Sequence, residues 1–265
     1  MASSLGPGAL AAPHAYSWVE AAVPHVGNAR TLLISKRPAG GYFLQSLTRG
    51  CRDQIHMNSK LNWDGDILSV QPRIRLTRSF DESSHTYLGF VLRVRGKLAG
   101  EAGEFAVAVG KAAHEKHEFR SGDRVSGVGE RVEDRRVETA DIYKASGLKV
   151  LGRAGESLGH APPFLGVPPA LDVYRERRHR RLAAATYSTK CSACIWGCEM
   201  AVEMIIDHWN PSVRRYRRET FCYGPKSCPW YKPGPTRKVP GRKGMSWEEE
   251  DWVDEDATAH RGPDD

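Results

Sequence analysis

Five of the six cysteines fall within 38 residues, and this cluster constrains the fold more than any other feature of the sequence. They follow the pattern C-x2-C-x3-C, then 23 residues, then C-x5-C: Cys191, Cys194, Cys198, Cys222 and Cys228. Two residues between thiols let one tight turn present both sulfurs to a single ion, and a hairpin of about twenty residues can return the second group to the first. Five thiols so close together therefore indicate a bound metal.

Two metals fit the cysteine spacing. Four thiolates around Zn2+ would use Cys191, Cys194, Cys222 and Cys228, with Cys198 spare or exchanging. A [4Fe–4S] cluster is the alternative, because the final Cys228-Pro229 is typical of some ferredoxins, although their C-x2-C-x2-C core is absent. Buried thiols without a metal are the third possibility, and Cys51 stands apart from the cluster.

The middle of the chain alternates apolar and polar residues as β-strands do. We expect five strands with one short helix, Lys111–Phe119, between the third and the fourth. The strands are Asp66–Ser79, Thr86–Leu98, Phe105–Val109, Arg124–Val132 and Thr139–Val150. The sequence thus predicts a mainly β chain with short helices (α+β), and this order of elements indicates an OB-like small β-barrel. Another small barrel, such as an SH3-like one, would give a similar pattern.

Composition divides the chain into segments. Residues 1–60 are rich in Ala, Gly, Pro and Ser and look weakly structured, and we expect that translation begins at Met57. The barrel would span 61–152, followed by a Pro/Gly linker over 153–169 and by a basic, Cys-rich module over 170–231. Residues 232–265 combine Pro, Gly and charge, so a disordered tail is predicted.

The Cys-rich module contains two expected elements beside its cysteines. Ala170–Tyr187 predicts a basic helix that begins after a Pro-Pro pair. Glu199–Trp209 and Val213–Tyr223 carry aromatic and β-branched residues at strand-like spacing, which predicts a hairpin. A short helix over Ala201–Trp209 is the competing prediction.

The net charge of +7 is unevenly distributed. Residues 171–247 hold 16 Lys or Arg against 6 Asp or Glu, whereas 248–265 hold 9 acidic residues and only Arg261. A basic region of this kind favours a polyanion, and RNA or single-stranded DNA is the partner we expect. The acidic tail, with Trp247 just before it and Trp252 within it, would dock either onto this chain or onto a protein partner.

Nine arginines are candidates for contacting nucleic acid. If the first two strands are neighbours, two Arg pairs on their outer faces would form one patch able to hold phosphate. The others come from the predicted helix and from the second arm of the hairpin. The candidates are Arg73, Arg75, Arg93, Arg95, Arg177, Arg178, Arg181, Arg214 and Arg215.

Compartment and catalysis are less sharply constrained. The chain has no run of about 18 apolar residues, and residues 1–19 lack a basic start, so we expect neither a membrane partner nor a secretory signal. A reducing, cytoplasmic compartment follows from that expectation and favours metal over disulfides. No nucleophile elbow, HExxH or kinase motif is present, so the sequence assigns no catalytic residue and leaves enzymatic activity open.

The segments CSACIWGC and CYGPKSCP give the chain a loose resemblance to uncharacterised bacterial proteins that pair an OB-like β-barrel with a C-terminal Cys-rich metal module. The resemblance concerns the fold and implies no activity. We therefore expect a non-catalytic nucleic-acid-binding protein with a structural metal site. An iron–sulfur protein acting in redox chemistry or within an enzyme, and an assembly scaffold acting through its acidic tail, are the alternatives.

Overall fold

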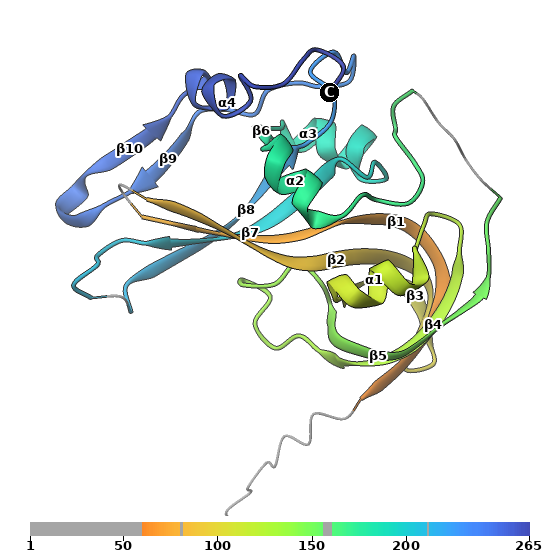
Figure 1. The fold of residues 1–265 in the computed structure, drawn as a ribbon. Coiled ribbons are helices and arrows are strands. Elements are labelled where there is room, and N and C mark those ends of the chain that lie inside the picture. Colours follow the sequence, from red (N-terminus) through yellow and green to blue (C-terminus); the bar gives the residue numbers. More distant parts are fainter. Residues whose placement is uncertain (1–59, 80–81, 156–160, 211) are drawn as a thin grey trace, which may run out of the picture. The chain divides into compact units, whose positions relative to one another are not determined.

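The computed structural model describes residues 60–79, 82–155, 161–210 and 212–265. The predicted weak structure of 1–60 and the predicted start at Met57 fall on residues that, Lys60 excepted, lie outside these ranges. Strands dominate, with short helices between them, so the expectation of a mainly β chain is confirmed (Figure 1). The strands are β1 Leu61–Arg78, β2 Ser83–Leu98, β3 Glu101–Val109, β4 Arg124–Arg131, β5 Ile142–Gly152, β6 Arg180–Arg181, β7 Gly197–Ile205, β8 Arg214–Cys222, β9 Arg237–Pro240 and β10 Ser246–Glu249. The helices are α1 Lys111–His117, α2 Leu171–Arg177, α3 Ala184–Thr186 and α4 Asp251–Ala257, with a π-helical turn at Tyr187–Cys191 and a 3₁₀ turn at Arg242–Gly244.

The first five strands close into a ring of backbone pairings. Strand β1 pairs antiparallel with both β2 and β4, and β2 pairs antiparallel with β3. The ring closes because β5 pairs with β4 on one side and, in parallel, with β3 on the other. All five strands and α1 lie where the alternation of apolar residues predicts them.

Glycine is required where β1 pairs with β2 and β4 at once. Gly65 of β1 lies directly opposite Gly96 of β2. A Cβ at position 96 would lie 2.0 Å from the backbone oxygen of Asp64, and one at position 65 would lie 2.5 Å from that of Arg95. Only residues without a side chain allow the two backbones to approach this closely.

Strand β1 also joins the ring to the Cys-bearing part of the chain. Its last residues, Arg75–Arg78, pair in parallel with Ala201–Met204 of β7, and β7 forms an antiparallel hairpin with β8. The predicted hairpin is thus confirmed, and the competing helix over Ala201–Trp209 is wrong. Figure 1 shows β7 and β8 running on from the ring as part of the same sheet.

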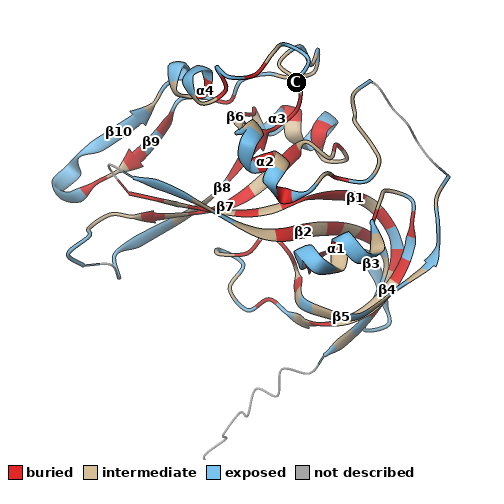
Figure 2. Cartoon of the chain, viewed as in Figure 1, coloured by how far each residue is buried: buried red, intermediate tan, exposed pale blue. Residues whose placement is uncertain are grey.

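One apolar core serves both parts. Figure 2 shows buried residues along the ring strands and continuing into β7 and β8. Leu92 and Val107 of the ring belong to the same buried cluster as Met200, Phe221 and Tyr223. The segments on either side of the predicted linker 153–169 therefore contribute strands to one sheet. They also belong to one compact unit, Ile55–Asp265.

The helix predicted over Ala170–Tyr187 is much shorter in the structure. Helix α2 ends at Arg177, because Arg178 adopts a left-handed conformation with φ of 58°. Arg180 and Arg181 then pair with β8, opposite Cys222 and Phe221. Pairing with β8 thus overrides the helical pattern of this segment.

The C-terminal segment, residues 232–265, is ordered, and the prediction of a disordered tail is wrong. Strands β9 and β10 form a two-stranded sheet, and α4 follows them (Figure 1). Val239, Asp254 and Thr258 are buried. The segment has few apolar residues, but its charged groups find partners in the preceding part of the chain, which the composition alone does not reveal.

Candidate metal centre

A small cavity lined by cysteines lies between the C-x2-C loop and the end of β8. Cys191, Cys194, Cys222 and Cys228 all contribute to its wall. Its volume of about 10 Å³ is roughly what one water-sized sphere needs. The structure thus brings together, from two distant segments, the four residues whose spacing predicts a zinc site.

The C-x2-C loop is a tight turn. The N–H of Cys194 donates to the oxygen of Cys191 at 3.1 Å, and the N–H of Gly197 donates to the oxygen of Cys194 at 3.1 Å. A Cβ at Gly197 would lie 2.5 Å from the oxygen of Cys191, so a side chain at this position would open the turn. The turn fixes both cysteines on one side of the cavity.

Gln71 of β1 anchors this loop to the ring. Its buried Nε2 donates to the backbone oxygens of Cys191 at 3.0 Å and of Cys194 at 2.9 Å. Its Oε1 accepts a hydrogen bond from the Tyr187 hydroxyl at 2.7 Å. Gln71 was not among the predicted site residues, and its only signal in the sequence is a polar side chain between Val70 and Pro72.

The second pair of cysteines is held by the chain that follows β8. The N–H of Gly224 donates to the Sγ of Cys222 at 3.4 Å, an N–H···S contact that is typical of thiolate sites. The N–H of Cys228 donates to the oxygen of Pro225 at 3.2 Å, which turns the chain back toward the cavity. Cys228 is half-buried, whereas Cys191, Cys194 and Cys222 are buried.

Bulky side chains screen the cavity from water. Apolar and aromatic residues share its wall with the cysteines: Phe164, Leu182, Trp196, Trp230 and Tyr231. A wall of this kind lowers the local dielectric and so strengthens the interactions between charges inside it.

Burial and the neighbouring cysteines keep the thiols of Cys191 and Cys194 protonated when no cation is present. Burial, and then the neighbouring Cys222, Cys194 and Cys228, raise the pKa of Cys191 to about 12. Burial likewise raises the pKa of Cys194 to about 11, against hydrogen bonds from backbone N–H groups. A dication between the sulfurs would reverse both effects, because it offsets the lost hydration and the repulsion between thiolates.

Positive charges surround the site. At Cys222, burial raises the pKa, and the adjacent Gly224 N–H and the Arg180 guanidinium oppose that rise. The guanidinium of Arg177 lies 4.6 Å from the ring centroid of Trp196, and that of Arg180 lies 3.8 Å from the ring of Tyr231. These cations would compensate the net negative charge of a metal held by four thiolates.

Cys198 lies elsewhere. It is fully buried in the main core, and its Sγ donates to the backbone oxygen of Pro72 at 3.3 Å. Burial and the nearby Glu199 raise its pKa. Cys198 is not among the residues that line the cavity. Its position therefore fits a spare structural thiol better than a metal ligand.

The cysteines line the cavity, but their sulfurs are not at the positions that coordination of one metal ion needs. Across residues 60–79, 82–155, 161–210 and 212–265, no three His, Cys, Asp or Glu side chains are arranged to hold a metal ion. A metal would therefore have to draw the sulfurs inward from the positions they occupy here.

The arginines of β1 and β2 do not form the single patch that was expected. The strands are neighbours, but Arg93 lies opposite Ser69, four residues along β1 from Arg73. Arg73 is paired with Glu138, and Arg93 and Arg95 share Glu104. Of these four residues, Arg75 has no acidic partner in the described part of the chain.

The arginines at the end of α2 and just after it mostly have partners inside the protein. Arg177 donates to the oxygen of Tyr223 at 2.8 Å. The guanidinium of Arg181 is fully buried and donates to Asp254 at 2.9 Å and to Asp251 at 2.5 Å, so its assignment to nucleic-acid contact is wrong. Arg178 stays exposed.

The two arginines at the start of β8 differ in whether an acidic residue pairs with them. Arg214 is paired with Glu203 on the opposite strand. Arg215 is exposed, and no described residue is its hydrogen-bonding or ion-pair partner. Arg215 is thus one of the few predicted contact residues whose charge is free for a ligand.

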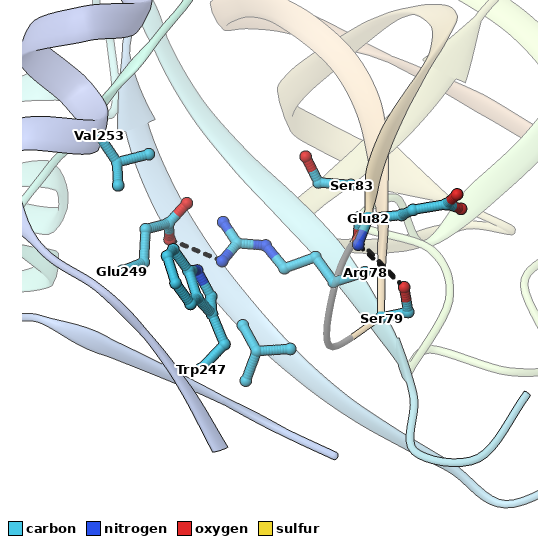
Figure 3. Close-up of a pocket in the computed structure, with 8 residues that line it drawn as sticks. Arg78, Ser79, Glu82, Ser83, Trp247, Glu249 and Val253 are labelled. Atoms are coloured by element: carbon cyan, nitrogen blue, oxygen red, sulfur yellow. Dashed lines mark hydrogen bonds and ion pairs between the residues drawn. The ribbon is translucent and has the colours of Figure 1, made fainter. Parts of the chain in front are cut away.

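A further cluster of charges, which the sequence does not predict, holds the C-terminal segment in place. Buried Glu219 is paired with Arg78 at 3.4 Å, with Arg237 at 2.7 Å and with Arg217. Arg78 also contacts Glu249 of β10 at 2.6 Å, and both residues line a cavity of about 370 Å³ (Figure 3). The positive charge of Arg78 is therefore neutralised within the chain.

The fold and the site define the class as a mainly β protein with a cysteine-lined cavity. Comparison with protein-family models, with curated protein sequences and with solved structures finds no match to this chain. In the described residues, no helix is long and apolar enough to cross a membrane.

Proposed function

We propose that this chain is a non-catalytic binding protein for RNA or single-stranded DNA, organised by a structural zinc ion. The observation that carries the proposal is that four thiols from two distant segments line one ion-sized cavity. A Zn2+ ion bound there would cross-link the C-x2-C loop to the end of β8, and its binding free energy would add to the folding free energy.

The size of the cavity favours one ion over a cluster. A volume of about 10 Å³ suits a single Zn2+ after a small inward movement of the sulfurs. A [4Fe–4S] centre has eight atoms of its own and would need the surrounding aromatic residues to move apart. The nearby guanidiniums of Arg177, Arg180 and Arg261 fit a Zn2+(Cys)4 site, whose net charge is negative.

Strand order and charge favour nucleic acid as the ligand. We infer an OB-like barrel from the ring β1-β2-β3-β5-β4 with α1 between β3 and β4, and barrels of this kind often bind oligonucleotides. The net charge of +7 adds attraction for a polyanion. Because electrostatics would supply most of the affinity, binding should weaken steeply with salt.

Metal analysis tests the zinc site. Protein purified anaerobically under reducing conditions should contain about one zinc ion per chain. The double variant Cys191→Ser/Cys222→Ser should lose the zinc and much of its stability, while Cys198→Ser should keep the zinc. A brown protein that contains iron and sulfide would show that the cysteines hold an iron–sulfur cluster and not zinc. An unchanged zinc content in the double variant would refute the site.

Binding of labelled oligo(dT) and oligo(U) tests the ligand class. The logarithm of the affinity should fall with the logarithm of salt concentration, by about 0.7 per phosphate contacted. A difference between the two oligonucleotides would tell DNA from RNA. Absence of binding at low salt, or binding that salt does not change, would remove nucleic acid from the proposal.

The scaffold alternative has less support. Its acidic tail would have to be available to a partner, but Glu249, Asp251 and Asp254 are paired with arginines of the same chain. Recruitment of a protein through this tail would therefore need those ion pairs to break.

A further inference from the structure

The loop between β7 and β8 presents an aromatic side chain that the fold does not use. Trp209 is 85% exposed, more than any other large apolar side chain of the described residues. Its backbone N–H donates to the Asp207 carboxylate at 3.0 Å, which fixes the backbone of the loop at this residue. An exposed indole on an ordered turn offers a flat face for stacking.

A cavity of about 400 Å³ lies beside this indole. Two segments distant in the sequence line it: the hairpin loop, with Ile206 and Trp209, and the turn between β9 and β10, with Arg242, Lys243 and Met245. Met245 is 50% exposed, so apolar surface continues across the cavity. Its volume exceeds that of a single nucleobase.

The charge around this cavity favours an anion. Arg242 and Lys243 are exposed, and in the described part of the chain their side chains have no hydrogen-bonding or ion-pair partner. Asp207 is the one acidic residue of the wall. Arg215 is also unpaired and lies two residues along β8 from Arg217, on the same face of the hairpin. Because Arg217 donates to the oxygen of Lys238, that face is turned toward β9.

The outer face of β2 and β3, by contrast, is poorly suited to phosphate. Glu104 forms ion pairs with both Arg93 and Arg95 there, so only one of their two positive charges stays uncompensated. Tyr187 and Glu199, from the Cys-bearing part, also line the cavity of about 250 Å³ beside Arg93. The face that OB-like barrels commonly use is thus partly covered by this chain's own residues.

We propose that the hairpin loop and the β9–β10 turn form a binding site for single-stranded nucleic acid, in which a base stacks on Trp209 and adjacent phosphates contact Arg242 and Lys243. The site deepens the proposed function and rests on it. Stacking on one aromatic side chain together with cations that follow the backbone is the usual means of binding single strands without sequence preference.

Substitution of Trp209 tests the stacking. With oligo(dT) of about 15 nucleotides, long enough for an OB-type site, Trp209→Ala should weaken binding about 5- to 100-fold, and Trp209→Phe should restore most of it. Trp252→Ala removes another exposed indole, on α4, and should leave the affinity unchanged. The quenching of tryptophan fluorescence by the oligonucleotide should shrink in Trp209→Ala and persist in Trp252→Ala.

Substitution of the cations tests their interaction with phosphate. Arg242→Gln/Lys243→Gln should lower the salt dependence by about 0.7 for each phosphate that is no longer bound. Lys116→Gln/Lys149→Gln, which removes two exposed lysines on α1 and β5, should leave the salt dependence unchanged. If wild-type protein binds oligo(dT) and Trp209→Ala binds it equally well, this site is refuted and the proposed function stands. If wild-type protein binds no oligonucleotide, both fail. A concentration-dependent dimer that Trp209→Ala abolishes, with oligonucleotide binding intact, would assign the cavity to a second copy of the chain instead.

Discussion

Two histidines from distant segments meet where β2 begins. The rings of His85 and His179 lie 4.8 Å apart, and His179 packs in turn against Phe221. Burial, and then the charges of Arg78 and Arg178, lower the pKa of His85 to about 4. Burial and the adjacent His85 also lower the pKa of His179. Both rings are therefore neutral at pH 7.

We expect His85 to make the fold sensitive to acid. Because the pKa of His85 is lower in the folded chain, the unfolded chain binds the proton more tightly. The contribution of neutral His85 to stability is therefore full above about pH 6.5 and is lost as the pH falls toward 4. For this one group the free energy of unfolding should fall by about 2 kcal/mol between pH 7 and pH 5.

Urea unfolding at these two pH values measures the effect. His85→Phe should reduce the loss of stability, whereas His208→Gln, at an exposed position on the hairpin loop, should not. An equal loss in wild type and in His85→Phe would show that other groups cause the acid sensitivity.

Among the elements, α4 depends most clearly on one residue outside it, Arg181. Asp254 is buried in its middle and accepts hydrogen bonds at 2.9 Å from both the backbone N–H and the Nε of Arg181. The Tyr231 hydroxyl donates to the oxygen of Arg181 at 2.9 Å, so the same residue also holds the chain that follows the cysteines. Interactions of this kind order a segment too polar to form a core of its own.

Asp254→Asn should destabilise the protein by about 3 kcal/mol, because it leaves the buried charge of Arg181 without its main partner. Asp256→Asn, on the exposed side of α4, should change stability by less than about 0.5 kcal/mol. Thermal unfolding of both variants measures the difference, and limited proteolysis should cleave the C-terminal segment faster in Asp254→Asn. Equal stability of the two variants would mean that α4 does not depend on this ion pair.

At the scale of the whole molecule, β1 is the shared element. It pairs with two strands of the ring and with β7 of the Cys-bearing hairpin, and residues from both parts pack in one core. Gln71, on the same strand, holds the C-x2-C loop. Loss of structure in one part must therefore expose apolar surface of the other.

Residues 55–265 should accordingly unfold in one cooperative transition. Urea unfolding followed by tryptophan fluorescence and by far-ultraviolet circular dichroism should give coincident curves. The proposed zinc site further predicts that a chelator shifts this single transition to lower urea. Two separated transitions would indicate that the ring and the Cys-bearing part fold independently.

The local pattern of the sequence determined the strands and the grouping of the cysteines. Alternation at Ile74, Leu76, Leu92 and Val94 predicts both strands and which face is buried, because neighbouring residues of a strand point to opposite sides whatever else surrounds them. The spacing of Cys191, Cys194, Cys222 and Cys228 predicts that they meet, because a tight turn and a hairpin are both local structures.

Only the tertiary structure decided what the charges do. Arg181 and Asp254 are 73 residues apart, and Arg78 and Glu249 are 171 apart, and no periodicity connects such pairs. An arginine that contacts a ligand and one that is buried against a carboxylate look alike in a sequence, since the difference lies in the partner that folding brings to it. The composition of the acidic tail therefore predicted disorder, although its carboxylates complete the buried ion pairs that hold it in place.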